Sequence, residues 1–518
     1  MKTFLYTAIM LALSSAANAQ SAYHAETIAE SDLNGTARYI GMGGALGALG
    51  ADLSTMSNNP AGTGLYRRSD ASFTFGGVFT GNEGAMGHDR GRMSVDQAGV
   101  LFVLGGDGGS LRNINFGVNY QKKRNHLTNF AGGLDLAGGS QTFQLAEMAT
   151  DAYYDNNAFG ILADHTAPKR KSDTGELVYD GIFDDNYLAW QDGVDKKFQF
   201  IGLPATASNY RRASYGSNSQ IDFNLSANII DRVFAGISVG IYTMGYDREA
   251  AYSEKTEYAD YILRNRYHYS ADGVDVKLGF IFRPIEDSPF RFGLTAHTPI
   301  WYKVRDYNNL NVNANSIYGN TVVGDYTTET FECNFRTPWK FGVSLGHTVG
   351  NFLAIGAEYE YSDLPSCKYY YNRGDSYASD FVPINENIKA NLKGQHTVKV
   401  GVEAKPDDAF AVRLGYNFVS APFKNGAYNH LDYNSSYTET DFTNWKDIHR
   451  ITFGVGYRYK GGYIDLAYQY QMQNGDFYAY DYGGNYNAYS STGSCGAPAP
   501  TRITNNRSQV VATLGFKF

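Results

Sequence analysis

The chain has 518 residues, a formal net charge of −8, and 42 Tyr, 31 Phe and 57 Gly against only 13 Pro. The negative charge argues against nucleic-acid binding, because no basic patch accompanies it. After the first residues no apolar run reaches the length of a transmembrane helix. Tyr, Phe and Gly enriched together are typical of sheets that face lipid between aromatic belts.

The first nineteen residues have the pattern of an export signal. Lys2 supplies the positive charge, residues 4–13 form a short apolar run, and residues 17–19 (Ala-Asn-Ala) form a small-residue cleavage site. We expect cleavage before Gln20. No Cys follows closely, so a lipid anchor is not expected.

Residues 20–68 show no alternation of apolar and polar positions. From Gly41 to Gly64 the sequence is GMGGALGALGADLSTMSNNPAGTG. Small residues allow backbones to approach closely, and Asn before Pro favours an extended or turn conformation. We therefore expect a compact N-terminal segment that folds inside a larger structure.

Alternation with a period of two residues dominates from residue 69 to the end, which predicts strands with one apolar face. Residues 113–120 (NINFGVNY) and 220–229 (QIDFNLSANI) illustrate it. Pro338 interrupts the eighth predicted strand, which we interpret as one long strand with a bulge. The fourteen predicted strands span 69–80, 94–104, 112–123, 217–230, 233–247, 267–283, 290–304, 325–347, 351–361, 395–404, 409–419, 449–460, 463–472 and 507–518.

The predicted connections alternate strictly between short and long. The links at 231–232 and 461–462 have two residues each, whereas the link at 124–216 is very long. Outer-membrane barrels have an even strand number, short periplasmic turns and long extracellular loops, and here the last strand alternates up to Phe518. The sequence predicts an all-β fold, a 14-stranded antiparallel transmembrane β-barrel (69–518) in a Gram-negative outer membrane.

The predicted inward positions carry both signs of charge. Side chains alone fill the interior of an eight-stranded barrel, but a barrel of fourteen strands encloses more space. We expect a lumen held together by ion pairs and water, with His297 and His347 as interior side chains. In the alternative interpretation some basic residues contact a ligand carboxylate, and the candidates are Arg291, Lys340 and Arg413.

No motif predicts an enzyme, a metal site or a cofactor. Cys333, Cys367 and Cys495 lack metal-ligand spacing; Cys367 and Cys495 are predicted in external loops, either joined in a disulfide or unpaired. The sequence GVSLG at 342–346 places its Ser inside a strand, where a nucleophile elbow cannot form.

Three blocks of sequence carry a resemblance to a known family. The first block is the glycine-rich run followed by residues 52–54 (Asp-Leu-Ser) and 59–62 (Asn-Pro-Ala-Gly). The second is RFGLTAHTP at 291–299, and the third is TPWKFGVSLGH at 337–347. Together they resemble the long-chain fatty-acid transporter (FadL/TodX-like) family. The resemblance implies a barrel whose lumen is blocked by a hatch, here residues 20–68. It also implies that hydrophobic substrates land on external loops, move to an internal site and leave when the hatch rearranges.

The resemblance also indicates candidate sites. Some members release substrate through a gap at a kinked third strand, but here that strand has Gly117 and no proline. The predicted gating residues are Gly41, Gly43, Gly44, Asn59, Pro60, Ala61 and Gly62. Helical spacing within links 124–216 and 248–266 predicts a landing groove or, alternatively, a simple cap, formed by Leu145, Met148, Ala149, Tyr258, Tyr261 and Ile262.

The expected function is passive transport of hydrophobic small molecules, such as long-chain fatty acids. The expected partners are that substrate, outer-membrane lipid and lipopolysaccharide, with a monomeric chain and no nucleic acid. Two alternatives stay open. One is a diffusion porin for polar solutes. The other is a surface receptor or adhesin, for example for haem, which uses the Tyr-rich loops 420–448 and 473–506.

Overall fold

The computed structural model describes residues 21–518 except 106–108, 135, 137–138, 155–168, 171–176, 179–187, 191–197, 201, 203, 257–258, 317–318, 328–330, 372–380, 430, 432–436, 481–488, 491–492 and 495–498. The predicted export signal, Tyr258 and Cys495 therefore lie outside the described residues. Within the described residues, no helix has the length and apolar character needed to cross a membrane.

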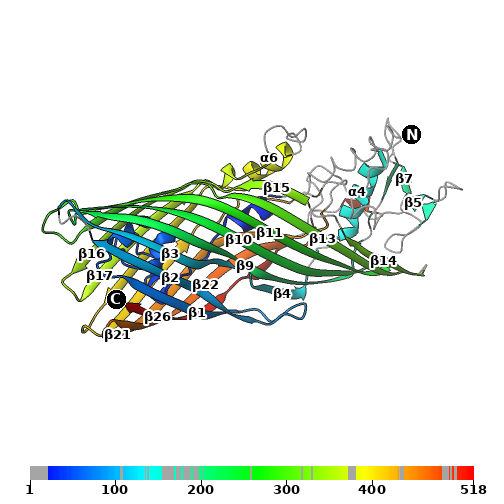
Figure 1. Ribbon diagram of the computed structural model, residues 1–518. Coiled ribbons are helices and arrows are strands. Elements are labelled where there is room, and N and C mark those ends of the chain that lie inside the picture. The colour runs from blue at the N-terminus through cyan, green and yellow to red at the C-terminus, as the bar shows by residue number, and fades with distance from the viewer. Residues whose placement is uncertain are drawn as a thin grey trace.

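Fourteen antiparallel strand positions form a closed barrel (Figure 1), which confirms the predicted fold class. The first strand pairs with the last from Asp70↔Lys517 to Thr80↔Arg507, so the barrel closes on itself. In chain order the positions are β1 (Asp70–Thr80), β2 (Gly91–Gly105), β3 (Leu111–Asn125), β9 (Ala207–Ile229), β10 (Val233–Lys255), β11 (Ala259–Phe282), β12 (Arg291–His297) with β13 (Trp301–Ser316), β14 (Gly319–Thr327) and β15 (Phe331–Arg336) with β16 (Lys340–Val349), β17 (Leu353–Ser362), β19 (Gln395–Ala404), β20 (Phe410–Val419), β21 (Phe442–Tyr459), β22 (Gly462–Tyr478) and β26 (Arg507–Lys517).

Shorter elements extend the rim and the loops. Three short strands pair with barrel strands: β4 (Thr128–Gly133) with β9, β18 (Lys368–Tyr370) with β15, and β25 (Thr501–Thr504) with β22. Loop helices are α4 (Gln141–Tyr154), η4 (Leu364–Ser366) and α6 (Val382–Asn391). Small two-stranded sheets pair β5 (Lys169–Arg170) with β6 (Leu177–Val178), β7 (Leu188–Trp190) with β8 (Phe198–Phe200), and β23 (Tyr489–Ser490) with β24 (Gly493–Ser494).

The barrel is apolar outside and polar inside. Phe223 is 43% exposed, whereas its neighbour Asp222 is fully buried. A water-soluble protein would bury the Phe and expose the Asp, so the outer face is suited to lipid. The prediction that His347 faces the lumen is wrong, because His347 lies on the exposed face of β16 and Gly346 faces inward.

Two adjacent strand positions are interrupted at the same level. The seventh was predicted as continuous over 290–304, but it breaks at 298–300 around Pro299. The eighth breaks at 337–339 around Pro338, so the predicted single bulge is also wrong. Proline has no N–H for the ladder. Threonine hydroxyls take over part of the pairing: Val276 N donates to Thr298 Oγ1 (3.0 Å), and Ile300 N donates to Thr337 Oγ1 (2.8 Å).

The barrel wall differs in height around its circumference. Strands β9 and β10 have 23 residues each and β11 has 24, whereas β17, β19 and β20 have 10 each. Helix α6 lies beside the rim on the low side (Figure 1). Residues 248–266 were predicted to include a loop helix; instead they extend β10 to Lys255 and begin β11 at Ala259. That prediction is wrong because strand pairing continues beyond the membrane.

The hatch lies inside the lumen. It comprises α2 (Ala22–Ala29), α3 (Ala37–Gly41), η2 (Leu53–Ser57) and η3 (Pro60–Leu65). Between Leu33 and Gly64 every residue except Arg38, Ala51 and Ser57 is buried. The predicted position of an N-terminal segment inside the barrel is therefore confirmed.

Candidate functional site

The glycine-rich part of the hatch lies directly against the barrel wall. Gly43 and Gly44 have φ values of +61° and +81°, a left-handed backbone that glycine adopts at little cost. The wall opposite is also glycine. A Cβ on Gly415 would overlap Gly43 N, and a Cβ on Gly401 would overlap Met42 O. A Cβ added to the neighbouring Gly41 would lie 3.2 Å from the Cα of Gly454. Glycines on both sides thus allow the hatch backbone to pack directly on the wall backbone.

The Asn-Pro-Ala-Gly run forms the second contact surface of the hatch. Asn59 caps η3 by accepting from Ala61 N (3.2 Å), and its Nδ2 donates to Gly47 O (2.7 Å). Pro60 occupies the first turn, where a missing N–H costs nothing. Ala61 packs against Phe234 and Ile281 of the wall. In Gly62 a Cβ would lie 2.8 Å from Thr55 Oγ1. The structure thus brings all seven predicted gating residues into the hatch.

Buried ion pairs join the hatch to the barrel near the short turns. Arg38 forms an ion pair with Glu403 (3.1 Å) and donates to Ala51 O (2.9 Å). Glu403 also pairs with Arg413 (2.7 Å), which in turn pairs with Asp465 (2.6 Å). Arg413, predicted as a ligand contact, is therefore placed in a network within the protein.

The other two basic residues that were predicted to contact a ligand in the lumen lie elsewhere. Arg291 donates to Leu49 O of the hatch (2.7 Å). Lys340 lines a cavity and forms an ion pair with Glu360 (3.7 Å). His297 lines the same cavity and donates to Asn58 O (2.8 Å), as expected for a hydrogen-bonded interior residue.

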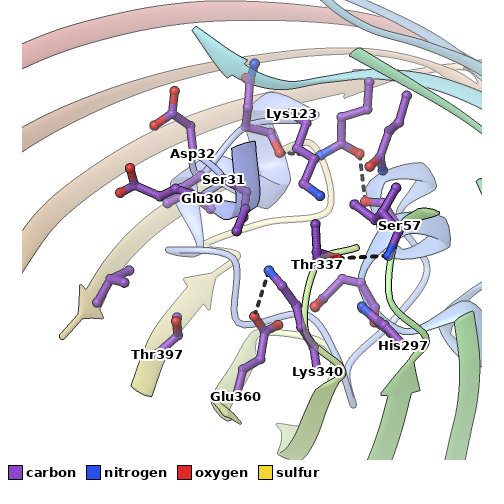
Figure 2. A pocket seen from close by; sticks show the side chains of 18 of the residues that line it. Glu30, Ser31, Asp32, Ser57, Lys123, His297, Thr337, Lys340, Glu360 and Thr397 are labelled. Carbon is purple, nitrogen blue, oxygen red and sulfur yellow. Dashed lines mark hydrogen bonds and ion pairs between the residues drawn. The ribbon is translucent and has the colours of Figure 1, made fainter. Parts of the chain in front are cut away.

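That central cavity lies between the hatch and the wall, at the level of the two strand breaks (Figure 2). Hatch residues 29–34 line one side, and Thr298, Ile300, Thr337 and Pro338 from the breaks line another. Figure 2 shows the side chain of Lys123, from β3, pointing into the open space. Sequence analysis did not single out Lys123. The feature of the sequence that points to it is the run of three basic residues at 122–124.

A second cavity lies at the outer end of the lumen, around α2. The ring of His24 contacts Glu439 (3.0 Å), and Tyr23 OH donates to Asn444 (2.7 Å). Glu439 also forms an ion pair with Arg248 of β10. Burial alone would raise the pKa of Glu439, but Arg248 and His24 hold it down to about 2. Glu439 thus joins the loop after β20 to both the hatch and the wall.

The predicted landing groove is only partly formed as expected. Leu145 and Met148 on α4 are buried in one cluster with Tyr261. Ile262 is half-buried on strand β11, and the side chain of Ala149 lies outside the described part. Leu145, Met148 and Tyr261 thus belong to an apolar cluster at the rim.

Two further expectations can be compared with the structure. At Gly117 on the third strand, a Cβ would overlap Met56 of the hatch and lie 2.8 Å from Leu101, so hatch and wall are in contact there. Cys333 and Cys367 are both buried. The pairing proposed for Cys367 involves Cys495, which the structure does not describe.

No family model and no curated protein matches this sequence. Solved structures resemble it in fold. A Pseudomonas aeruginosa FadL homologue has 12% identity over 94% of this chain and 99% of its own, with a TM-score of 0.53. The Ralstonia pickettii toluene transporter TbuX has 14% identity, 94% and 99% coverage and a TM-score of 0.48. The P. putida toluene transporter TodX has 11% identity, 94% and 99% coverage and a TM-score of 0.43.

At these identities the likeness shows the fold alone, and the FadL homologue superposes with a TM-score above 0.5. The class is an outer-membrane β-barrel with an N-terminal segment in its lumen. Within that class, this chain has the FadL type of fold.

Proposed function

We propose that this chain carries hydrophobic small molecules across the outer membrane by passive diffusion that is gated by the hatch, and that it is a transporter and not an enzyme. One observation carries the proposal: almost every residue between Leu33 and Gly64 is buried inside the barrel. A segment in that position has to rearrange before a solute can pass. The fold shared with a FadL homologue supports the same function.

Three cavities mark the proposed route. The outer and central cavities adjoin, because Glu30 lines both. A third cavity lies on the other side of the hatch, beside Arg38, Tyr66 and the tight turn at Gly461. The hatch separates the central cavity from this inner one, so hatch movement is the step that connects them.

A disulfide between hatch and wall tests the gating step. A Cβ on Gly293 would lie 3.5 Å from the Cβ of Ala48, within the range of disulfides. Ser344 Oγ overlaps that position and has no hydrogen-bond partner among the described residues, so Ser344→Ala makes room. We expect cells with the oxidised triple variant Ala48→Cys, Gly293→Cys, Ser344→Ala to lose uptake of labelled fatty acid and to regain it after reduction.

The control is the same variant with Ser in place of both Cys residues, which should transport under both conditions. Unchanged uptake by the oxidised protein would refute hatch gating. If deletion and complementation leave the uptake of a broad hydrophobic panel unchanged, the transport proposal itself is wrong. The porin alternative predicts large conductance in planar bilayers with the hatch in place, and the receptor alternative predicts direct binding of haem.

A further inference from the structure

The barrel wall is interrupted between its seventh and eighth strand positions. The ladder that pairs β12 with β16 ends at His297↔Lys340. The ladder that pairs β13 with β15 starts at Trp301↔Arg336. Three residues of each strand position lie between these two ladders, so the register is the same on both sides of the interruption. We call residues 298–300 and 337–339 the wall break.

Few hydrogen bonds hold the two sides of the wall break together. With the shared register Pro299 lies opposite Pro338, and neither proline has an N–H to donate. Among the described residues, Ile300 and Thr337 carry the hydrogen bonds across the break. Thr337 N donates to Ile300 O (3.2 Å), and Ile300 N donates to Thr337 Oγ1 (2.8 Å). Because each hydrogen bond stabilises the pairing, the two strand positions separate here at a lower free-energy cost than along a regular ladder.

The central cavity reaches the inner side of the wall break. Thr298, Ile300, Thr337 and Pro338 line this cavity, and Figure 2 shows Thr337 beside the open space. At this point the wall itself separates the cavity from the surrounding lipid. A local opening of the break would therefore connect the two.

The outer side of the wall break lies at the upper limit of the apolar belt. Trp301 (41% exposed) and Trp339 (49% exposed) flank the break on the lipid face, and Trp339 stacks on Phe341. The next outward-facing side chains of β13 are the charged and exposed Lys303 and Arg305. Tryptophan next to charged residues is typical of the boundary between acyl chains and head groups. Since β13 runs away from the short turns, this boundary belongs to the outer leaflet.

Apolar molecules concentrate in membrane lipid, because removal of apolar surface from water is favourable. We propose that the wall break is a side entrance, through which hydrophobic molecules pass from the outer leaflet between Ile300 and Pro338 into the central cavity. The inference rests on the transport function proposed above and adds a route that bypasses the outer cavity. Passage beyond the central cavity still requires the hatch to move. The entrance is distinct from the third strand, where Gly117 lies against the hatch.

Uptake of labelled dodecanol by cells that carry the full-length chain tests the side entrance. We expect the double variant Pro299→Val, Pro338→Val to lose most of the wild-type uptake, because valine supplies the missing N–H groups and favours a regular strand. The matched control is Pro284→Val, Pro406→Val, which changes two exposed prolines in the short turns and should transport normally. All variants are compared at equal amounts of folded barrel in the outer membrane.

A second pair of variants tests the lipid side of the entrance. Trp339→Ala removes a side chain that covers the break, so we expect dodecanol uptake to rise. Phe453→Ala is the matched control, because Phe453 is 48% exposed on the lipid face of β21, away from the break. If the double valine variant does not fold, this comparison decides.

The outcomes separate the side entrance from the transport proposal. Wild-type uptake by the folded double valine variant would overturn the side entrance, and so would equal uptake by Trp339→Ala and Phe453→Ala. In either case hydrophobic molecules enter through the outer cavity, and transport itself stands. If cells that lack the chain accumulate dodecanol at the wild-type rate, the transport proposal has failed and the side entrance fails with it.

Discussion

Arg38 links the hatch to the barrel wall and also braces the hatch internally. It contacts Glu403 on the wall and two backbone carbonyls in the hatch, Gly50 and Ala51. We expect Arg38→Met to destabilise the hatch by about 1–3 kcal/mol, since these carbonyls lose a charged donor. The predicted readout is a higher conductance in planar bilayers.

The matched control is Arg67→Met. Arg67 pairs with Asp231 at 2.9 Å, but its side chain is 74% exposed, and exposed pairs contribute little. Conductance that rises equally in both variants would show that Arg38 has no special role in holding the hatch.

Glu26 is a buried carboxyl, and none of the described basic residues forms an ion pair with it. Burial, and secondarily the neighbouring Glu30, raise its pKa well above the usual value. The wild-type protein therefore loses stability as pH rises above the unfolded value of about 4.3, because folding then opposes ionisation. We expect Glu26→Gln to raise the melting temperature at pH 8 and to have no effect near pH 4. A melting temperature unchanged at both pH values would contradict this.

At the scale of elements, the contact between the hatch turn and the wall depends on glycine. We expect Gly415→Ala to displace the turn at Gly43 and to cost about 1–3 kcal/mol, as over-packing does. Thermal unfolding and bilayer conductance measure the two consequences. Gly245→Ala on β10 is the control, because its Cβ would meet nothing within 4 Å. Wild-type behaviour of Gly415→Ala would mean that the hatch adapts to the wall.

Local sequence predicted the strands well within the membrane and poorly at its limits. Alternation over 220–229 identified β9, but β9 begins at Ala207, ten residues before the predicted start. Outside the membrane both faces of a strand can be polar, so alternation fades while pairing continues. The break at Pro299 was missed because alternating apolar residues continue on both sides of it.

At the scale of the whole molecule, the outer end of the lumen is closed by charges from distant segments. Because the pKa of Glu439 is held down to about 2, its ion pairs contribute stability that is complete above pH 4.3 and is lost as pH falls toward 2. We expect hydrogen exchange in α2 to accelerate over that window. Glu439→Gln should exchange faster already at pH 7 and depend less on pH. Exchange in α2 that is independent of pH between 4.3 and 2 would refute this.

The sequence by itself determined the architecture. A period of two residues repeated fourteen times leaves one apolar face per strand, and only a closed barrel satisfies every backbone group in lipid. The small residues of the hatch likewise predicted close packing inside the lumen.

Only the tertiary structure decided which charges are compensated. Arg38 and Glu403 are 365 positions apart in the sequence, and Lys277 on β11 reaches Asp222 on β9 across the strand between them, β10. Alternation tells which face a side chain occupies, but not its height along the barrel or its neighbours from the hatch. Which lumen charges meet one another therefore follows only when strand register and hatch are both in place.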